Sequence, residues 1–331
     1  YEGATEAERY EGVLQVLTAR IEREPAYKRV AADVYRQQYY REVIGEDLDG
    51  YELDRAYRET FVENVERGAE LGILDDRLVE RFDLDDLAAS LVPDRDRGFE
   101  YMAMETLSQR YFLKTADGAR LELPQAFWMR VAMGLAIDED DPQARAEEFY
   151  DVLSTFEFTP SSPTLFHSGT EHPQLSSCYL TTIPDDLEGI FDSYKHHAQL
   201  SKWSGGLGND WTNVRAAGSL ISSTGVESTG TVPFLRISND VTAAINRSGK
   251  RRGAACGYLA CWHLDFPEFL DLKRNTGDER RRTPDMNTAA WIPDLFLKRV
   301  REDGEWTLFS PDEVPDLHET YGQDFEAAYR E

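Results

Sequence analysis

The pattern of apolar residues changes near Ser176, and that change limits the folds open to this chain. Before Ser176, apolar residues recur at helical spacing, which is typical of the core-facing side of amphipathic helices. One such stripe comprises Leu53, Tyr57, Phe61 and Val65, and another comprises Tyr101, Met104, Leu107 and Tyr111. After Ser176, short β-prone runs alternate with helical segments, which favours a mostly parallel sheet or barrel. We therefore expect an α/β chain, with a helical domain over 1–176 and an α/β domain over 177–331.

Several element boundaries can be predicted from local chemistry. Thr5 and Glu8 have the spacing of a capping box, so a helix should begin after Thr5. Pro124 and Pro142 each suit the first position of a helix, because proline lacks the amide hydrogen that this position leaves unused. The expected strands are 178–183, 254–262, 287–292 and 306–309, and the expected helices of the second half include 188–203 and 233–246.

The charge of the chain is strongly acidic. It holds 62 acidic and 36 basic residues, for a net charge of −26, and only seven of the basic residues are lysine. A surface with many carboxylates and few lysines stays hydrated in concentrated salt, where the Debye length falls to about 3 Å at 1 M. This composition suggests a haloarchaeal source. The alternative is an acidic surface that docks a basic partner. Such a charge disfavours direct binding to nucleic acid, which depends on neutralising phosphates.

Composition also limits location and cysteine chemistry. No apolar run approaches the roughly 20 residues that span a bilayer, and the first residues lack an export signal, so we expect a cytoplasmic protein without membrane contact. Three cysteines in 331 residues do not make a disulfide framework. A functional cysteine would therefore be catalytic or redox-active. The histidines show no spacing that supplies a third ligand, so no metal site is expected.

The segment 156–180 holds the first candidate for chemistry. It places two serine-rich turns ahead of Cys178. Ser162 and Ser177 are short hydroxyl donors, and a thiol can be alkylated, oxidised or paired. From these residues alone, the simpler interpretation of Cys178 is a buried small side chain, since free cysteine is among the most buried residue types.

A basic, glycine-containing turn is the second candidate. Arg247, Lys250, Arg251 and Arg252 alternate with Ser248, Gly249 and Gly253. Glycines let the backbone approach an anion, and arginine is a forked donor, so phosphate binding is one interpretation. The other is a solvated helix end whose cations oppose the helix dipole. A further run, 280–282, has no glycine and suits a solvated loop or ion-pair partners.

Several motifs that follow one another in a fixed order carry a resemblance. They are SKWSGGLG at 201–208, VRAAGS at 214–219, GKRRGAA at 249–255, WHLDFPEFLDLK at 262–273 and WIPDLFLKRV at 291–300. In this order, after the serine-serine-cysteine of 176–178, they closely resemble the large subunit of ribonucleotide reductase. Separated motifs in one order are far more specific than any one of them alone. The resemblance implies a helical amino-terminal domain followed by the first half of a ten-stranded α/β barrel.

The resemblance implies roles for particular residues. The family reduces the ribose of ribonucleotides, most often diphosphates, by thiyl-radical chemistry with a redox cysteine pair. Cys178 matches the first cysteine of that pair, which would close a disulfide that is later reduced by exchange. The implied substrate contacts are Ser162, Ser177, Gly206 and Arg251.

The resemblance also implies an effector site for ATP, dATP, dTTP or dGTP. Asp186 resembles the acid that reads the effector's deoxyribose, and Lys202 and Arg215 resemble its phosphate ligands. Leu187 stands where many relatives carry serine, so its contact would be through backbone only. The implied effector contacts are Asp186, Leu187, Glu188, Lys202, Arg215, Ser222 and Ser223. Two specificity loops are expected at 215–225 and 246–254, where a bound nucleotide can reorder glycine- and arginine-containing backbone.

The sequence departs from the family pattern in its cysteines. No asparagine-leucine-cysteine-x-glutamate run with the radical cysteine is present. Cys256 and Cys261 are five residues apart on an expected strand, so they should point to opposite faces, and we interpret both as core thiols. We therefore expect a partial, inactive portion of the enzyme.

The resemblance implies partners and a radical source, but it leaves more than one possibility for each. The radical would come from a metal-containing small subunit or from adenosylcobalamin, with no cofactor held in this chain. Thioredoxin or a glutaredoxin-type protein would be the reductant, and a homodimer would form through the helix 188–203. Two other functions stay open: a nucleotide-binding regulatory protein that has lost catalysis, and another radical enzyme of the same barrel type, such as a glycyl-radical relative.

Overall fold

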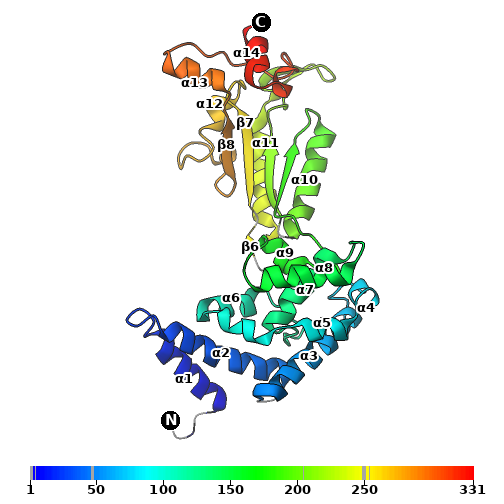
Figure 1. Ribbon diagram of the computed structural model, residues 1–331. Coiled ribbons are helices and arrows are strands. Elements are labelled where there is room, and N and C mark those ends of the chain that lie inside the picture. Colours follow the sequence, from blue (N-terminus) through cyan, green and yellow to red (C-terminus); the bar gives the residue numbers. More distant parts are fainter. Residues whose placement is uncertain (1–2, 4, 46–47, 204, 248–250, 253) are drawn as a thin grey trace. The chain divides into compact units, whose positions relative to one another are not determined.

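The computed structural model describes residues 3, 5–45, 48–203, 205–247, 251–252 and 254–331. It divides into two compact units, Tyr1–Leu175 and Ser176–Glu331, one residue from the boundary that the sequence suggested (Figure 1). No helix among the described residues is long and apolar enough to cross a membrane.

Among its described residues, the regular elements of the first unit are helices, joined by turns and loops that hold two isolated β-bridges. Its elements are α1 (Glu6–Thr18), α2 (Tyr27–Ile44), α3 (Gly50–Glu70), α4 (Arg77–Glu80), α5 (Leu84–Ser90), the 3-10 helix η1 (Pro93–Gly98), α6 (Tyr101–Arg110), α7 (Pro124–Ala136), α8 (Pro142–Ser154) and α9 (Ser162–His167). The expected capping box is present, because Thr5 accepts from the Glu8 amide and Glu8 from the Thr5 amide. Pro124 and Pro142 begin α7 and α8 as predicted.

A single hydrophobic core holds this unit together, and α7 lies at its centre. Phe127, Met129 and Val131 of α7 are fully buried, and the stripe of α3 contributes Tyr57 and Phe61. Arg130 is buried in the same core, where it pairs with Glu122 at 2.8 Å and donates to the carbonyls of Leu165 and Ser168. This buried ion pair therefore fixes α9, the short helix that begins at Ser162.

The second unit is built on a four-stranded parallel sheet. In sequence its elements are β1 (Cys178–Thr182), α10 (Leu187–Lys202), β2 (Gly206–Asp210), β3 (Ala217–Ile221), β4 (Val226–Thr229), α11 (Thr231–Ala244), β5 (Asn246–Arg247), β6 (Arg251–Arg252), β7 (Ala255–Ala260), α12 (Phe266–Phe269), η2 (Glu279–Arg281), β8 (Asn287–Trp291), α13 (Asp294–Arg301), η3 (Leu317–Glu319) and α14 (Gly322–Arg330). The sheet order is β1-β2-β7-β8, and β3-β4 and β5-β6 form two antiparallel hairpins.

One face of the parallel sheet is covered by helices (Figure 1). Leu207, Ala255 and Leu259 point to this face and form a core with Ile190 and Tyr194 of α10 and Leu235 of α11. The opposite face carries Cys178 and Leu180, and the Leu180 side chain is 81% exposed. The helices therefore leave open the face that bears Cys178.

The expected strand at 306–309 is wrong. Within 306–309, only Phe309 forms a β-bridge, and its partner is His263. Trp306 and Phe309 instead pack against Tyr329 of α14, and the Thr307 amide donates to the Tyr329 hydroxyl at 2.6 Å. Aromatic packing against a helix replaces strand pairing in this segment.

Candidate functional site

Cys178 begins β1 and is exposed, so the structure rejects the interpretation of a buried small residue. The neighbouring Ser177 hydroxyl donates to the Cys178 sulfur at 3.8 Å, and the Ser177 carbonyl accepts from the Gly206 amide at 2.7 Å. Three of the expected site residues, Ser177, Cys178 and Gly206, are thus in direct contact at the amino end of the sheet.

Glycines of β2 form the floor beside this thiol. Cys178 pairs with Gly206, and Leu180 pairs with Gly208. A Cβ placed on Gly206 would lie 3.5 Å from the Cys178 sulfur, and one on Gly208 would lie 2.5 Å from Leu180 Cδ2. Gly206 therefore leaves its backbone uncovered by a side chain of its own next to the Cys178 sulfur, which suits the close approach of a ligand, whereas the Leu180 side chain already covers Gly208.

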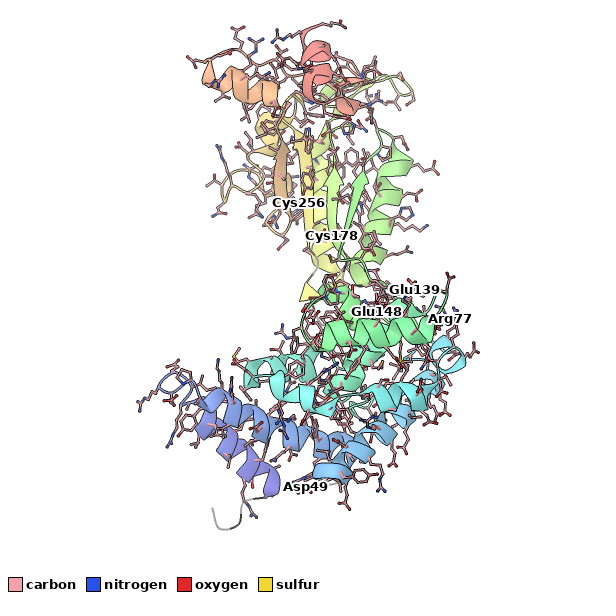
Figure 2. All side chains as sticks on the ribbon, in the orientation of Figure 1. Asp49, Arg77, Glu139, Glu148, Cys178 and Cys256 are labelled. Carbon is pink, nitrogen blue, oxygen red and sulfur yellow. The ribbon has the colours of Figure 1, made fainter. Side chains whose placement is uncertain are left out.

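Cys256 corrects the expectation of two core thiols. Cys261 is buried, and burial raises its thiol pKa to about 12. Cys256 pairs with Gly208 and is partly exposed on the Cys178 face (Figure 2). Cys256 lies in β7, whereas Cys261 lies one residue beyond its end and is buried, so only Cys261 fits the interpretation as a core thiol. Sequence reasoning missed Cys256 because a strand pattern alone does not say which face is covered.

Cys256 is nevertheless out of reach of Cys178 for a disulfide. β2 lies between their strands, so the two backbones are two strand spacings apart, about 10 Å. Disulfides need Cα atoms within about 7 Å. The second thiol of a redox pair with Cys178 is therefore neither Cys256 nor the buried Cys261.

Ser162 lies in the other unit, at the start of α9. Its hydroxyl is 3.2 Å from the Tyr111 hydroxyl, and Pro163 follows it at the first turn of the helix. The hydroxyl is half-buried, and Arg130 holds the far end of α9 through two backbone carbonyls. The Ser162 position is thus set by a buried ion pair that the sequence pattern did not reveal.

The second cluster of expected residues lies where β1 leads into α10. Asp186 caps α10, its carboxylate accepting from the Gly189 amide at 2.7 Å. Leu187 and Glu188 open the helix and are exposed. The guanidinium of Arg215 pairs with Asp185, at 2.8 Å from Nη2 to Oδ2, and its Nη1 donates to the Leu220 carbonyl. The structure therefore brings Asp185, which sequence reasoning missed, to Arg215.

The remaining expected contacts are spread around this cluster. Ser222 and Ser223 lie at the exposed tip of the β3-β4 hairpin, so the expected loop 215–225 is a hairpin. Lys202 ends α10, about 24 Å from Asp186 at 1.5 Å per residue, and its ammonium lies 5.0 Å from the Trp203 ring centre. Within one chain, Lys202 is therefore not part of the Asp185 and Arg215 cluster.

For the expected loop 246–254, the structure describes only part of the backbone. Its backbone forms the β5-β6 pair, in which Arg247 is opposite Arg251. The side chain of Arg251 and residues 248–250 and 253 lie outside the described residues. The phosphate-binding interpretation of this turn therefore stays a prediction.

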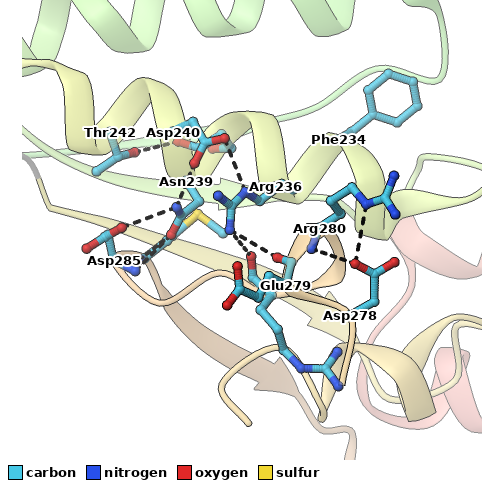
Figure 3. Close-up of polar contacts among 12 residues, drawn as sticks. Phe234, Arg236, Asn239, Asp240, Thr242, Asp278, Glu279, Arg280 and Asp285 are labelled. Atoms are coloured by element: carbon cyan, nitrogen blue, oxygen red, sulfur yellow. Dashed lines mark hydrogen bonds and ion pairs between the residues drawn. The ribbon is translucent and has the colours of Figure 1, made fainter. Parts of the chain in front are cut away.

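The helix that leads into this turn is firmly held. Arg236 of α11 donates to the carbonyls of Glu279 and Arg282, and the Asn239 side-chain oxygen accepts from the amides of Asp285 and Met286 (Figure 3). In the same segment, Arg280 pairs with Asp278 and Arg281 with Glu268. Arg280 and Arg281 are thus ion-pair partners, as one interpretation of this run had it, whereas Arg282 donates to the carbonyls of Thr276 and Arg281.

Comparisons with known proteins agree with this arrangement. Residues 97–173 match the model of the ribonucleotide reductase all-alpha domain, and residues 176–331 match that of the ribonucleotide reductase barrel domain. The chain is 49% identical over 331 residues to the ribonucleoside-diphosphate reductase subunit alpha of Chlamydia muridarum, covering 100% of this chain and 31% of that protein.

More distant organisms give the same result. The chain is 48% identical to the subunit alpha of Helicobacter pylori over 93% of its length and 38% of that protein. It is 45% identical to the ribonucleoside-diphosphate reductase large chain of Neurospora crassa, over 74% of its length and 26% of that protein. The chain thus spans about a third of the length of these relatives.

Proposed function

Because this chain belongs to the ribonucleotide reductase large-subunit family, we propose that it supplies part of the site at which ribonucleoside diphosphates are reduced to deoxyribonucleotides. The observation that carries this is the exposed thiol of Cys178, which lies against the glycine floor of an open sheet face. A sugar resting on that floor would have its carbons within reach of the thiol. Ser177 and Gly206 contact the same space, and Ser162 is proposed as a further substrate donor.

The reduction needs a second thiol. Cys178 would give up hydrogen and electrons and then form a disulfide, which a thioredoxin- or glutaredoxin-type protein would reduce by exchange. Because Cys256 and Cys261 cannot pair with Cys178, we propose that these 331 residues alone do not complete the redox pair. Relatives are named alpha or large subunits, and we propose that the radical comes from a separate small subunit rather than from adenosylcobalamin.

The effector site is proposed at the Asp185 and Arg215 cluster. Arg215 offers a forked donor for phosphate, and Asp185 keeps it oriented through a two-point contact with its backbone amide and guanidinium. Asp186 is committed to capping α10, so we propose that Asp185 takes the role that sequence pattern suggested for Asp186. The exposed hairpin tip with Ser222 and Ser223 would close over the nucleotide, beside the backbone of Leu187 and Glu188.

Lys202 fits this site only in a dimer. Two copies of α10 packed antiparallel would bring the carboxyl end of one helix to the amino end of the other. Lys202 of the second copy would then reach a nucleotide held by Arg215. The exposed Leu187 and Phe191 side chains on α10 suit such a contact.

Effector binding can be tested on the chain by calorimetry with dTTP in high salt. Arg215→Ala should abolish saturable binding and Asp185→Asn should weaken it, whereas Asp186→Ala should bind normally with a less stable helix. Arg274→Ala is the matched control, because Arg274 pairs with Asp271 on the surface of the same unit. In the Lys202→Ala variant, dTTP should no longer increase the fraction of dimer, as measured by light scattering. Unchanged binding in Arg215→Ala would rule out this effector site.

We also propose that the protein works at high salt, as the net charge of −26 suggests. The few lysines and many carboxylates support this, because a carboxylate-rich surface stays hydrated where salt screens repulsion.

A further inference from the structure

The backbone on either side of Arg215 is held by side chains from other parts of the second unit. Each of the four residues 214–217 has one backbone group in a hydrogen bond to a side chain that is distant in sequence. We refer to three of these side chains, those of His263, Asp265 and Ser310, as the clamp. The four bonds, 2.8 to 3.0 Å long, join the Val214 carbonyl to His263, the Arg215 amide to Asp185, the Ala216 amide to Ser310 and the Ala217 amide to Asp265.

Asp265 joins the two ends of the β3-β4 hairpin. Its Oδ1 accepts from the Ala217 amide, where the hairpin begins, and its Oδ2 accepts from the amide and hydroxyl of Thr231, just after the hairpin ends. The residue is 6% exposed, so these donors take the place of water around the carboxylate. Between the two ends, Gly230 has a φ of 77°, and a Cβ there would lie 2.7 Å from the Ala217 nitrogen. Glycine therefore allows both ends of the hairpin to reach one carboxylate.

The hydroxyl of Ser310 holds the middle of this segment. It donates to the Asp312 carboxylate, and it therefore accepts from the Ala216 amide at 3.0 Å and from the Ser219 hydroxyl at 2.7 Å. Ser310 is 2% exposed, and Ala216 is fully buried. Water therefore cannot replace this bond without a local opening of the structure.

The ring of His263 holds the carbonyl that precedes Arg215. Its Nδ1 accepts from the Asp265 amide at 3.0 Å, so the neutral ring carries its proton on Nε2 and donates to the Val214 carbonyl at 2.8 Å. Burial lowers the pKa of His263, which favours this neutral form.

The two chain segments that carry the clamp are joined through their backbones. The Phe309 amide donates to the Trp262 carbonyl, and the Phe309 carbonyl accepts from the Leu264 amide, both at 2.8 Å. The clamp residues at 263–265 and at 310 therefore form one connected support.

A fixed backbone determines where the guanidinium of Arg215 can lie. Asp185 contacts its Nε and Nη2, and the Leu220 carbonyl accepts from its Nη1. Arginine has five N–H donors, and these contacts occupy at most three of them. The other donors are oriented before a ligand arrives, which lowers the entropy lost when a phosphate binds.

We propose that His263, Asp265 and Ser310 are positioning residues for Arg215, and that they hold its guanidinium ready for the phosphates of a nucleoside triphosphate. This rests on the proposed function, because it assumes that Arg215 binds the phosphates of an effector. The clamp acts through the backbone of 214–217 and needs no contact with the nucleotide.

Calorimetric titration of the 331-residue chain with dTTP tests the proposal. Ser310→Ala should weaken dTTP binding about tenfold, as expected when one buried hydrogen bond is lost. Asp265→Ala should weaken it at least as much, because both ends of the hairpin lose their acceptor. His263→Gln should bind dTTP more tightly than His263→Leu, since the glutamine amide can still donate to the Val214 carbonyl.

Asn239→Ala is the matched control for general loosening of the unit. The Asn239 side-chain oxygen also accepts from two backbone amides in a fully buried position, but these belong to Asp285 and Met286 (Figure 3). A urea midpoint for each variant measures the loss of stability. Equal losses of dTTP affinity in Asn239→Ala, Ser310→Ala and Asp265→Ala would overturn the positioning role.

A second background separates positioning from stability. Arg215→Lys retains the positive charge but lacks the forked donor whose direction the clamp fixes. Ser310→Ala should therefore cost about tenfold in dTTP affinity in the otherwise unaltered chain and less than about twofold in the Arg215→Lys background. An equal loss in both backgrounds would contradict an action through Arg215.

Hydrogen–deuterium exchange of the ligand-free chain tests the clamp without a nucleotide. The amides of 215–217 should exchange slowly in the unaltered chain and faster in Ser310→Ala, with no change in Asn239→Ala. Rapid exchange of these amides in the unaltered chain would overturn the clamp itself.

The outcomes separate this inference from the proposed function. Loss of dTTP binding in Arg215→Ala, together with normal binding in Ser310→Ala and Asp265→Ala, would overturn the positioning role and leave the effector site standing. Normal binding in Arg215→Ala would overturn the effector site and the positioning role with it.

Discussion

At the scale of single residues, the most constrained group outside the candidate site is the carboxylate of Asp96. It is fully buried, and it accepts from the hydroxyls of Tyr40 and Tyr57 and from the Gln125 amide at 2.6 Å. Burial raises the pKa of Asp96 to about 6, although these three donors lower it. The donors stabilise a charge that the core alone would reject.

Tyr57→Phe should destabilise the first unit by about 1–3 kcal/mol, because it leaves buried polar groups without a partner. The Tyr57 hydroxyl donates to Asp96 at 2.9 Å and accepts from the Gln125 backbone amide at 2.8 Å. Tyr51→Phe is the matched control, since Tyr51 lies in the same helix and is 82% exposed. Urea unfolding followed by circular dichroism gives the comparison. Equal midpoints for the two variants would contradict the network's role.

His318 offers a pH-dependent contact. Its Nε2 lies 2.6 Å from Asp210 Oδ2, and this hydrogen bond raises the pKa of His318. Burial raises the pKa of Asp210, but bonds from His318 and Thr212 bring it below its usual value. A raised histidine pKa means stability that is complete below about pH 6.5 and lost as pH rises through the folded-state pKa.

His318→Gln should therefore destabilise the second unit more at pH 6 than at pH 8.5, by roughly 1 kcal/mol. His196→Gln is the control, because His196 is exposed on α10. Thermal unfolding at both pH values measures the difference. A loss that is the same at both would show that the charge of His318 contributes nothing.

At the scale of elements, Gly257 and Gly208 differ in how tightly the two faces of the sheet are packed around them. A Cβ on Gly257 would lie 3.0 Å from Leu235 Cδ2 and 3.2 Å from Met286 Cε, both in the core. A Cβ on Gly208 would approach Leu180 more closely, but Leu180 is exposed and can rotate away.

Gly257→Ala should consequently cost about 1–3 kcal/mol of stability through overpacking, and Gly208→Ala should cost less. Melting temperatures of the two variants provide the measurement, with Gly208→Ala as the matched change on the open face. A larger loss in Gly208→Ala would mean that the Cys178 face is packed rather than open.

Elements were predictable where local chemistry acts alone. The Thr5 cap and the prolines of α7 and α8 set helix starts, and β-prone runs identified β1, β7 and β8. The strand β2 was not predicted, because its sequence GLGND lacks the side chains that strands prefer and is held by neighbours on both sides. The segment 306–309 has aromatic residues that strands prefer, but it forms no strand because these residues pack on α14.

At the scale of the whole molecule, the net charge of −26 dominates. Self-repulsion of this size opposes compaction, and salt weakens it as the Debye length falls from about 10 Å at 0.1 M to about 3 Å at 1 M.

The melting temperature should therefore rise between 0.2 M and 3 M KCl, with most of the gain in the first molar. Sucrose at equal osmolality is the control for exclusion effects that do not involve charge. A melting temperature that does not depend on KCl would favour the alternative, in which the acidic surface docks a basic partner.

By itself, the sequence determined the helical half, the α/β half and the motifs that identify Cys178, because periodicity, caps and ordered motifs are local properties. Only the tertiary structure decided that Cys256 and Tyr258 share the face of Cys178, that Asp185 holds Arg215, and that Lys202 lies at the other end of α10. These facts depend on strand order, register and which sheet face the helices cover. Each is set by contacts between residues that are distant in sequence.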